Sequence, residues 1–289
     1  MSKQKIVFSN GLECYYLSSK EETEFIFSEI FTEQQYLRNG IVVNQGDCIF
    51  DVGANIGLFS LFVSRLQKDL KIYAFEPIKP TFKVLQENID LHSLHDVSLF
   101  NYGLSSENNA EKLFTFYPNM AGNSTTKPVE KLEQKEIMNV ILPQEKVEYF
   151  FQNSEVNGEV RTLSSVIDEL NIETIDLLKV DVEGEEYEVL KGIEEKDWGK
   201  IKQVFAEVHD REGRLEQMQT LLTTHGFDVT VEKNRPLEQI RNLKLSAISI
   251  NSLNYLIKTA FRLLINYLCK KSNSLVPTVN NINLYAVRN

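Results

Sequence analysis

Two pairs of ionisable side chains close two successive apolar stretches in the second half of the chain. Asp181 and Glu183 end one stretch, and Glu207 and His209 end the next. In a strand, residues two apart point to the same face, so each pair would present both side chains together. Histidine titrates near neutral pH and suits general-base chemistry, and a carboxylate beside it can fix its tautomer. We therefore expect His209 to act as a general base oriented by Glu207.

The same cluster has a second chemical interpretation. Carboxylates and imidazole are ligands of divalent metal ions, and such an ion lowers the pKa of a bound alcohol. The spacing does not require a metal, so a site without one is favoured. Glu207 also has a purely structural interpretation, as an acceptor for backbone amides. The other histidines lie at predicted helix ends or turns and are expected to be solvated: His92, His95 and His225.

A glycine-containing motif occupies the first half of the chain. Residues 51–57, DVGANIG, follow a buried apolar stretch and precede a helical pattern. Glycines let the backbone turn tightly and approach a ligand closely. The spacing differs from the GxGxxG fingerprint of dinucleotide sites, and Asp51 puts a carboxylate where that fingerprint binds phosphate. The motif favours a ligand with an ammonium or hydroxyl group, and a plain strand-to-helix turn is the alternative.

A single acid ends the next predicted strand. Glu76 follows Asp51 by 25 residues, a separation that accommodates one helix and one strand. In dinucleotide-binding folds an acid at this strand end accepts the hydroxyls of a ribose. A solvated strand end would explain an isolated acid equally well, but the preceding glycine motif favours the ligand interpretation.

Taken together, these motifs resemble the FkbM family of S-adenosylmethionine-dependent methyltransferases. The matching strings are IFDVGANIG at 49–57, AFEP at 74–77, KVDVEGE at 179–185, VLKG at 189–192, EVH at 207–209 and NLYA at 283–286. The resemblance covers about residues 45 to 232 and resumes near 281. The lead-in, with EIF at 29–31 and YL at 36–37, resembles O-methyltransferases associated with polyketide and peptide synthases.

The resemblance implies S-adenosylmethionine as cofactor, with S-adenosylhomocysteine as its product. Asp51 would hold the amino group of the methionine part, directly or through water, and Glu76 the ribose hydroxyls. Asn101 or its neighbours at the end of the third strand would border the adenine. Tyr36 would close over the cofactor, although a packing role suits it equally, and Glu183 would lie toward the substrate. The remaining residues implied at the cofactor are Gly53, Ala54, Asn55, Gly57, Pro77 and Asp181.

The elements that must position these residues alternate along the chain. Strand patterns occur at 48–50, 71–75, 97–102, 177–182, 203–208, 227–231 and 283–287, and helical patterns at 56–66, 81–91, 163–170, 187–192 and 214–224. This alternation predicts an α/β fold with a doubly wound, mostly parallel sheet, Rossmann-like as in class I methyltransferases. Ligands of such sheets bind beyond the carboxyl ends of the strands, where the strand order reverses.

Three segments stand outside the alternation. Residues 1–46 are expected to form a lead-in or lid, with a hairpin at 6–18 and a helix at 20–38, before a methyltransferase domain at 47–289. That domain carries insertions at about 107–161 and about 236–280, the first predicted to be part strand and part flexible helix. Apolar residues recur at helical spacing over 253–268. They indicate a helix packed on the domain, and the alternatives are a substrate lid, a carrier-domain dock or a membrane-surface helix.

Charge and cysteine content narrow the class of protein. The 289 residues include 31 Lys and Arg against 41 Asp and Glu, a net charge of −10, which disfavours nucleic acid as a partner. Three scattered cysteines form no disulfide framework and favour a reducing, cytoplasmic setting. No signal peptide and no membrane-spanning apolar run is apparent. The sequence does not indicate an oligomeric state.

We therefore expect an enzyme that methylates a hydroxyl of a secondary-metabolite intermediate, a polyketide or peptide, either free or tethered to an acyl carrier domain. A sugar or glycan O-methyltransferase is the alternative among enzymes. A protein that binds the cofactor without catalysis is the alternative from another class. Glu207 and His209 disfavour that last alternative, because a binding protein has no need of them.

Overall fold

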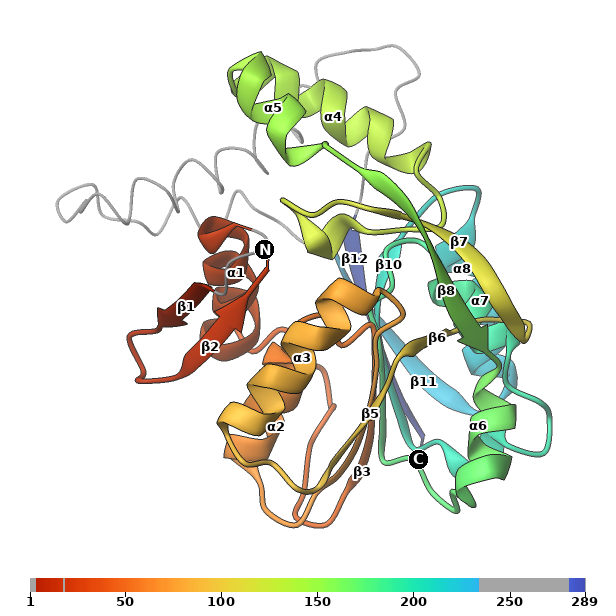
Figure 1. Ribbon diagram of the computed structural model, residues 1–289. Helices are drawn as coiled ribbons and strands as arrows, with labels where there is room; N and C mark the ends of the chain where they lie inside the picture. Colours follow the sequence, from red (N-terminus) through yellow and green to blue (C-terminus); the bar gives the residue numbers. More distant parts are fainter. Residues whose placement is uncertain (1–3, 18, 234–280, 289) are drawn as a thin grey trace, which may run out of the picture.

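A twisted seven-stranded sheet forms the centre of the computed structural model, which describes residues 4–17, 19–233 and 281–288 (Figure 1). The second expected insertion, with its apolar segment at 253–268, lies outside the described residues. The strand order is β11-β12-β10-β9-β3-β4-β5. The strands are β3 Cys48–Val52, β4 Lys71–Phe75, β5 Val97–Phe100, β9 Leu177–Val180, β10 Gln203–His209, β11 Phe227–Lys233 and β12 Asn281–Arg288.

The pairing of these strands confirms the predicted α/β fold. Strands β5, β4, β3, β9 and β10 are parallel, and β12 runs antiparallel between β10 and β11. The chain passes outward from β3 through β4 to β5 and then returns to β9 on the other side of β3. The order of the strands therefore reverses between β3 and β9, and the crevice at their carboxyl ends is the expected ligand position.

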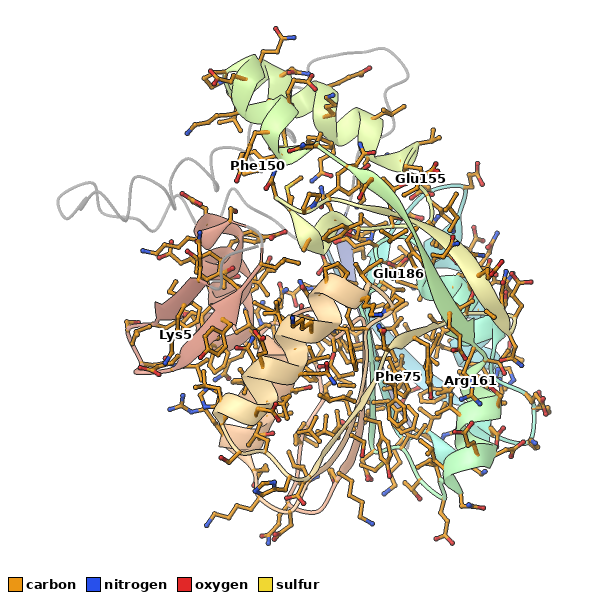
Figure 2. All side chains as sticks on the ribbon, in the orientation of Figure 1. Lys5, Phe75, Phe150, Glu155, Arg161 and Glu186 are labelled. Carbon is orange, nitrogen blue, oxygen red and sulfur yellow. The ribbon has the colours of Figure 1, made fainter. Side chains whose placement is uncertain are left out.

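Helices cover both faces of the sheet. One apolar cluster joins the sheet to α2 Leu58–Leu66 and α3 Lys79–Leu91, and a second joins it to α6 Leu163–Leu170, α7 Glu186–Lys191 and α8 Arg214–Thr224. Every residue of β3 is buried, as expected of a central parallel strand covered on both faces. Side chains such as that of Phe75 fill the space between the layers (Figure 2). Within the described ranges, no helix combines the length and apolar character that crossing a membrane requires.

The lead-in packs against the α2 side of the sheet. It consists of a hairpin, β1 Gln4–Val7 with β2 Glu13–Tyr16, and helix α1 Lys20–Phe27, whose first turn is capped by the Ser19 hydroxyl. The helix continues as a π-helical turn, Ser28–Thr32, and ends there rather than at residue 38. Tyr36 therefore lies in the loop beyond the helix. The Phe31 ring stacks on Phe27 and packs edge-on against Phe62 of α2, which helps to hold the lead-in on the domain.

The first insertion has more regular structure than its polar sequence suggests. Its strands β7 Asn109–Phe116 and β8 Ser154–Arg161 form a separate sheet with β6 Tyr102–Leu104, which precedes the insertion, in the order β6-β8-β7. Between β7 and β8 the chain forms helices α4 Glu130–Ile141 and α5 Gln144–Phe150. These helices stand above the carboxyl edge of the central sheet (Figure 1). The insertion is therefore placed to contribute to a site at that edge.

A buried ion pair joins the two strands at which the strand order reverses. The Lys179 ammonium on β9 lies 3.1 Å from Asp51 Oδ1 on β3 and donates to the Gly53 carbonyl at 2.8 Å. Ser60 donates to the other Asp51 oxygen at 2.7 Å. Burial lowers the pKa of Lys179, but attraction by Asp51 and then Asp181 outweighs that effect and raises it. The pair thus ties β9, β3 and the glycine loop into one unit.

We expect Lys179→Met to destabilise the fold by roughly 3–5 kcal/mol, because it leaves the Asp51 carboxylate buried without its cation. Urea denaturation measures this loss. The matched control is Lys202→Met, which removes a solvent-exposed partner of Asp176 and should change stability little. Equal stability of the two variants would show that the buried pair is not a structural requirement.

Candidate active site

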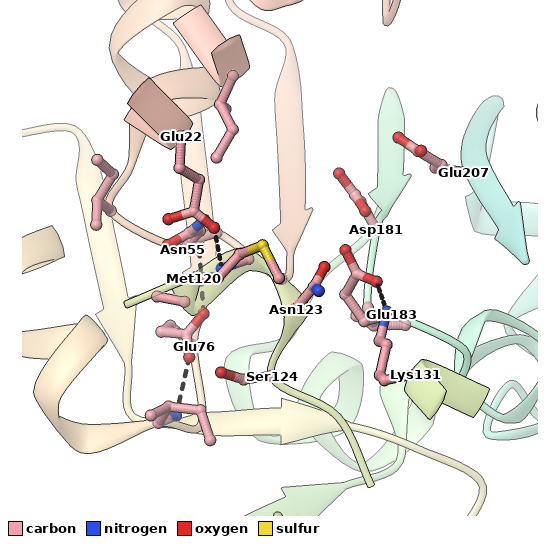
Figure 3. Close-up of a pocket in the computed structure, with 18 of the residues that line it drawn as sticks. Glu22, Asn55, Glu76, Met120, Asn123, Ser124, Lys131, Asp181, Glu183 and Glu207 are labelled. Atoms are coloured by element: carbon pink, nitrogen blue, oxygen red, sulfur yellow. Dashed lines mark hydrogen bonds and ion pairs between the residues drawn. The ribbon is translucent and has the colours of Figure 1, made fainter. Parts of the chain in front are cut away.

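A cavity of about 940 Å³ opens at the carboxyl ends of β3, β4, β9 and β10. Its walls come from the glycine loop, the turn after β4, the loop after β9, the end of β10, the lead-in and the first insertion. Figure 3 shows Asn55 and Glu76 on one side, Asp181, Glu183 and Glu207 on the other, and Met120 of the insertion between them. Residues from both halves of the sequence therefore meet in one site.

The Asn55–Glu76 side of the cavity offers buried hydrogen-bond acceptors. Glu76 accepts the backbone N–H groups of Asn55 at 3.1 Å and Ile78 at 2.9 Å. Burial nevertheless raises the pKa of Glu76 to about 7, outweighing those two hydrogen bonds. The side-chain oxygen of Asn55 is buried without a hydrogen-bond partner among the described residues. A carboxylate and an unused amide oxygen suit the hydroxyl and ammonium groups of S-adenosylmethionine, so this half of the cavity fits the cofactor.

Two glycines of the motif are required by the packing of the protein itself. Gly53 has a φ of +77°, and a Cβ there would lie 1.9 Å from the backbone oxygen of Asp181. Gly57 has a φ of +89°, and a Cβ there would lie 2.6 Å from the Leu85 side chain on α3. Gly53 and Ala54 line the cavity, whereas Gly57 faces α3 and does not. Close packing against α3 therefore explains the glycine at position 57, and its contact with the cofactor stays a prediction.

Two further residues expected at the cofactor lie behind the cavity wall, although Gly103 and Leu104, close to Asn101 in sequence, do line it. Asp51 is fully buried beneath the loop, where Lys179 and Ser60 engage its carboxylate, and it does not line the cavity. Asn101 also lies off the cavity wall, and its amide donates to the backbone oxygens of Glu76 and Pro77. Each of the two therefore supports a segment that does reach the cavity, including the wall residue Pro77.

Tyr36 and Asp181 form a contact between the lead-in and the central sheet. The Tyr36 hydroxyl donates to Asp181 Oδ2 at 3.0 Å, and both residues line the cavity. The ring of Tyr36 packs edge-on against Phe59 and Phe205. Burial raises the pKa of Asp181, more than the nearby Lys179 lowers it. The lead-in thus contributes directly to the wall of the site, beside the glycine loop.

His209 is held between two carboxylates, neither of which is the expected one. Its Nε2 lies 3.2 Å from Glu183 and its Nδ1 lies 3.3 Å from Glu186, at the start of α7. Burial lowers the pKa of His209, but Glu183 and then Glu186 outweigh it and raise that pKa to about 10. Glu207 shares a strand face and the cavity with His209, yet the ring contacts come from the other two acids. At neutral pH His209 is therefore an imidazolium, which cannot accept a proton.

Glu183 reaches the cavity through a turn rather than a strand. Strand β9 ends at Val180, so alternation along a strand does not relate Asp181 to Glu183. Glu183 adopts a left-handed backbone with a φ of +54°. Its carboxylate pairs with Lys131 of α4 as well as with His209. Burial would raise the pKa of Glu183, but these two cations lower it to about 2. The carboxylate is therefore ionised throughout the physiological range.

The sequence analysis assigned no role at the site to three charged residues, Lys179, Lys131 and Glu186. Lys179 carried a usable signal, because a lysine inside a buried strand requires a partner. Lys131 and Glu186 lie in segments rich in charged residues, and nothing in the sequence distinguishes them from their neighbours. Among the residues that the structure describes, no group of three or more His, Cys, Asp or Glu side chains is arranged to hold a metal ion.

Comparison with known proteins gives a consistent result. Residues 51–229 match the family described as "Methyltransferase FkbM domain". "Methyltransferase sdnD" of Sordaria araneosa is 39% identical over 229 residues, covering 76% of this chain and 87% of that protein. "31-O-demethyl-FK506 methyltransferase FkbM" of Streptomyces tacrolimicus is 37% identical over 223 residues, covering 74% and 85%. "AMB antimetabolite synthetase AmbE" of Pseudomonas aeruginosa is 33% identical over 245 residues, covering 75% of this chain but 11% of that protein.

Glu76→Gln should weaken S-adenosylmethionine binding at pH 8 by roughly 1.5–3 kcal/mol, because the ribose hydroxyls lose a charged acceptor. Since the pKa of Glu76 is about 7, affinity of the parent protein should fall as the pH is lowered through 7, when the carboxylate becomes protonated. Calorimetric titrations between pH 6 and 8 measure both effects. Asp90→Asn, on the exposed side of α3, is the control. An unchanged affinity in the Gln variant would remove Glu76 from the site.

Proposed function

The chain belongs to the FkbM family of S-adenosylmethionine-dependent methyltransferases, and from that premise we propose that it methylates a hydroxyl of a polyketide or peptide intermediate. The observation that carries the proposal is the shared cavity, which joins the acceptors at Asn55 and Glu76 to the charged cluster around Glu183. A bound cofactor supplies an electrophilic methyl group on a sulfonium, and the chain's residues must orient the attacking oxygen.

An ionised carboxylate is a suitable acceptor for a hydroxyl proton in this reaction. An alcohol that gains a methyl group becomes a protonated ether, which is a far stronger acid than any carboxylic acid. The low pKa of Glu183 is therefore no obstacle to its accepting that proton. Its hydrogen bond to the hydroxyl would also hold the attacking oxygen in line, which is a large part of what an enzyme can contribute. We assign the proton acceptor to Glu183.

His209 then has a different role from the one its residue type indicates. As an imidazolium between Glu183 and Glu186, it fixes the position and charge of Glu183. In this assignment His209 is a positioning residue, and Glu186 anchors its far nitrogen. Glu207 and Asp181 complete the acidic wall of the cavity. No divalent metal is needed for this chemistry, so activity should persist in the presence of a chelator.

Two observations support the proposed class of acceptor. Apolar side chains line the part of the cavity formed by the lead-in and the insertion, among them Ile26, Met120, Met138 and Phe150. Such a surface suits a carbon skeleton better than a free sugar. The similar segment of AmbE lies within a much longer protein named a synthetase, which supports an acceptor presented by a carrier domain.

A turnover assay tests the proposal directly. The protein is incubated with methyl-labelled cofactor and three acceptor groups: free hydroxyacyl compounds, the same compounds tethered to an acyl carrier protein, and uronic acids or glycosylated products. Each reaction is repeated with a chelator. We expect labelling of the hydroxyacyl acceptors in both conditions. Transfer to the sugars alone, or transfer that needs a restored divalent ion, would contradict the proposal, as would cofactor binding without any transfer.

The pH dependence of turnover separates the two roles considered for His209. If neutral His209 were the base, the rate would rise with pH up to its pKa of about 10. If its imidazolium positions Glu183, the rate should be level through neutral pH and fall as the pH passes about 10. We expect the second profile. His209→Asn should lower kcat roughly 10²-fold, as expected for a misplaced reacting group, with cofactor affinity retained.

The exposed His95 provides the control, because His95→Asn removes an imidazole far from the cluster. The control should leave both kcat and the pH profile unchanged. A rate that climbs steadily to pH 10 in the parent protein would contradict the positioning role and return His209 to the position of base.

A further inference from the structure

A short segment of the first insertion, residues 125–131, holds the loop that carries Glu183. We call residues 125–131 the clamp segment and residues 181–186 the catalytic loop. Four side chains of the clamp segment contact the catalytic loop. The contacts run from Thr125 Oγ1 to the Glu183 carbonyl at 2.8 Å, from Thr126 Oγ1 to Glu185 at 2.8 Å, from Lys127 Nζ to the Gly184 carbonyl at 2.7 Å, and from Lys131 Nζ to the Glu183 carboxylate.

We propose that Lys131 is a positioning residue of the active site, which holds Glu183 as an oriented, ionised carboxylate facing the acceptor. This inference rests on the proposed function for the role of Glu183 but not for the interaction itself. It gives the insertion a part in the chemistry, since the central sheet alone does not supply this cation.

The placement of Lys131 is unusual for a residue that only stabilises a helix. It lies in the first turn of α4, where the helix dipole disfavours a positive charge. It is also buried, with a side chain only 7% exposed, and it lines the cavity. A lysine is rarely buried unless it is paired. The partner that compensates both costs is Glu183, whose left-handed backbone is itself an imposed conformation.

Other residues dock α4 on the domain, which separates docking from the role of Lys131. Glu130 pairs with Arg214 at 2.9 Å, and Glu133 pairs with Arg211 at 2.6 Å. Both arginines belong to the segment that follows β10. The helix should therefore remain in place when Lys131 is replaced, and only the charge facing the cavity changes.

The groups around Glu183 allow the effect of that change to be predicted. Lys131 faces it from α4 and His209 from β10, while Asp181 repels it from its own loop. Behind His209 stands Glu186, which Arg214 also approaches. Without Lys131, His209 alone of the two cations paired with Glu183 would remain. Glu183 should then bind a proton more readily, and its pKa should rise.

The test is a carboxyl titration followed by ¹³C NMR on the full chain with labelled glutamate, in which Glu183→Gln identifies the signal. The pKa of Glu183 should rise by at least about one unit in Lys131→Met, since an opposite charge this close lowers a carboxyl pKa by roughly 1–3 units. Lys131→Arg should keep the parent value. The matched control is Lys135→Met, one turn along α4, whose lysine pairs with Glu148 away from the site.

The second measurement is turnover against pH with the acceptor identified by the assay above. The acid limb of kcat should move to higher pH in Lys131→Met by the same amount as the NMR shift, and Lys131→Arg should restore it. Unchanged cofactor affinity shows that the Lys131→Met variant is folded. If Lys131→Met does not fold, Lys131→Gln is measured in its place.

Three results are informative about which proposal fails. An unshifted Glu183 titration in Lys131→Met or Lys131→Gln would overturn the role of Lys131. A higher KM for the acceptor with an unmoved acid limb would overturn it as well, because Lys131 would then bind the acceptor itself. A shifted titration in a protein that methylates no hydroxyl compound would support the ion pair and reject the proposed function instead.

Discussion

The buried ion pair between Lys179 and Asp51 is the interaction on which the rest of the site depends. It joins β9 to β3 where the strand order reverses, and the same ammonium bonds to the carbonyl of Gly53. Gly53 in turn lies so close to the backbone of Asp181 that no residue with a side chain fits at this position. The glycine loop and the catalytic loop therefore cannot be placed independently. Any ligand held by the first loop faces the residues of the second.

The carboxylates that line the cavity beyond this pair also have donors or cations beside them. Asp181 receives the Tyr36 hydroxyl from the lead-in, and Glu183 receives an imidazolium from β10 and an ammonium from the insertion. The lead-in and the insertion thus add donors to the acids at the carboxyl edge of the central sheet. In the proposed reaction, this arrangement keeps one carboxylate ionised next to a positively charged methyl donor.

Local sequence was sufficient to predict the parts of this structure that arise from local patterns. The alternation of strand and helix patterns predicts the central sheet. The ionisable residues Glu76, Asp181 and His209 at the predicted strand ends indicate where the cavity lies. The sequence could not give the partners of His209, because Glu183 reaches it through a left-handed turn and not by strand alternation. Lys131 comes from a helix some fifty residues before the catalytic loop, and only the tertiary fold brings the two together.

The central claim is that the cofactor's sulfur and the Glu183 carboxylate share one cavity across which the acceptor binds. A crystal structure with S-adenosylhomocysteine and a methylated product analogue measures this arrangement. We expect the ribose on Glu76, the methionine part at Asn55, and the acceptor oxygen in hydrogen-bond contact with Glu183 and in line with the sulfur. An acceptor oxygen that contacts neutral His209 instead, or a sulfur that faces away from the catalytic loop, would contradict it.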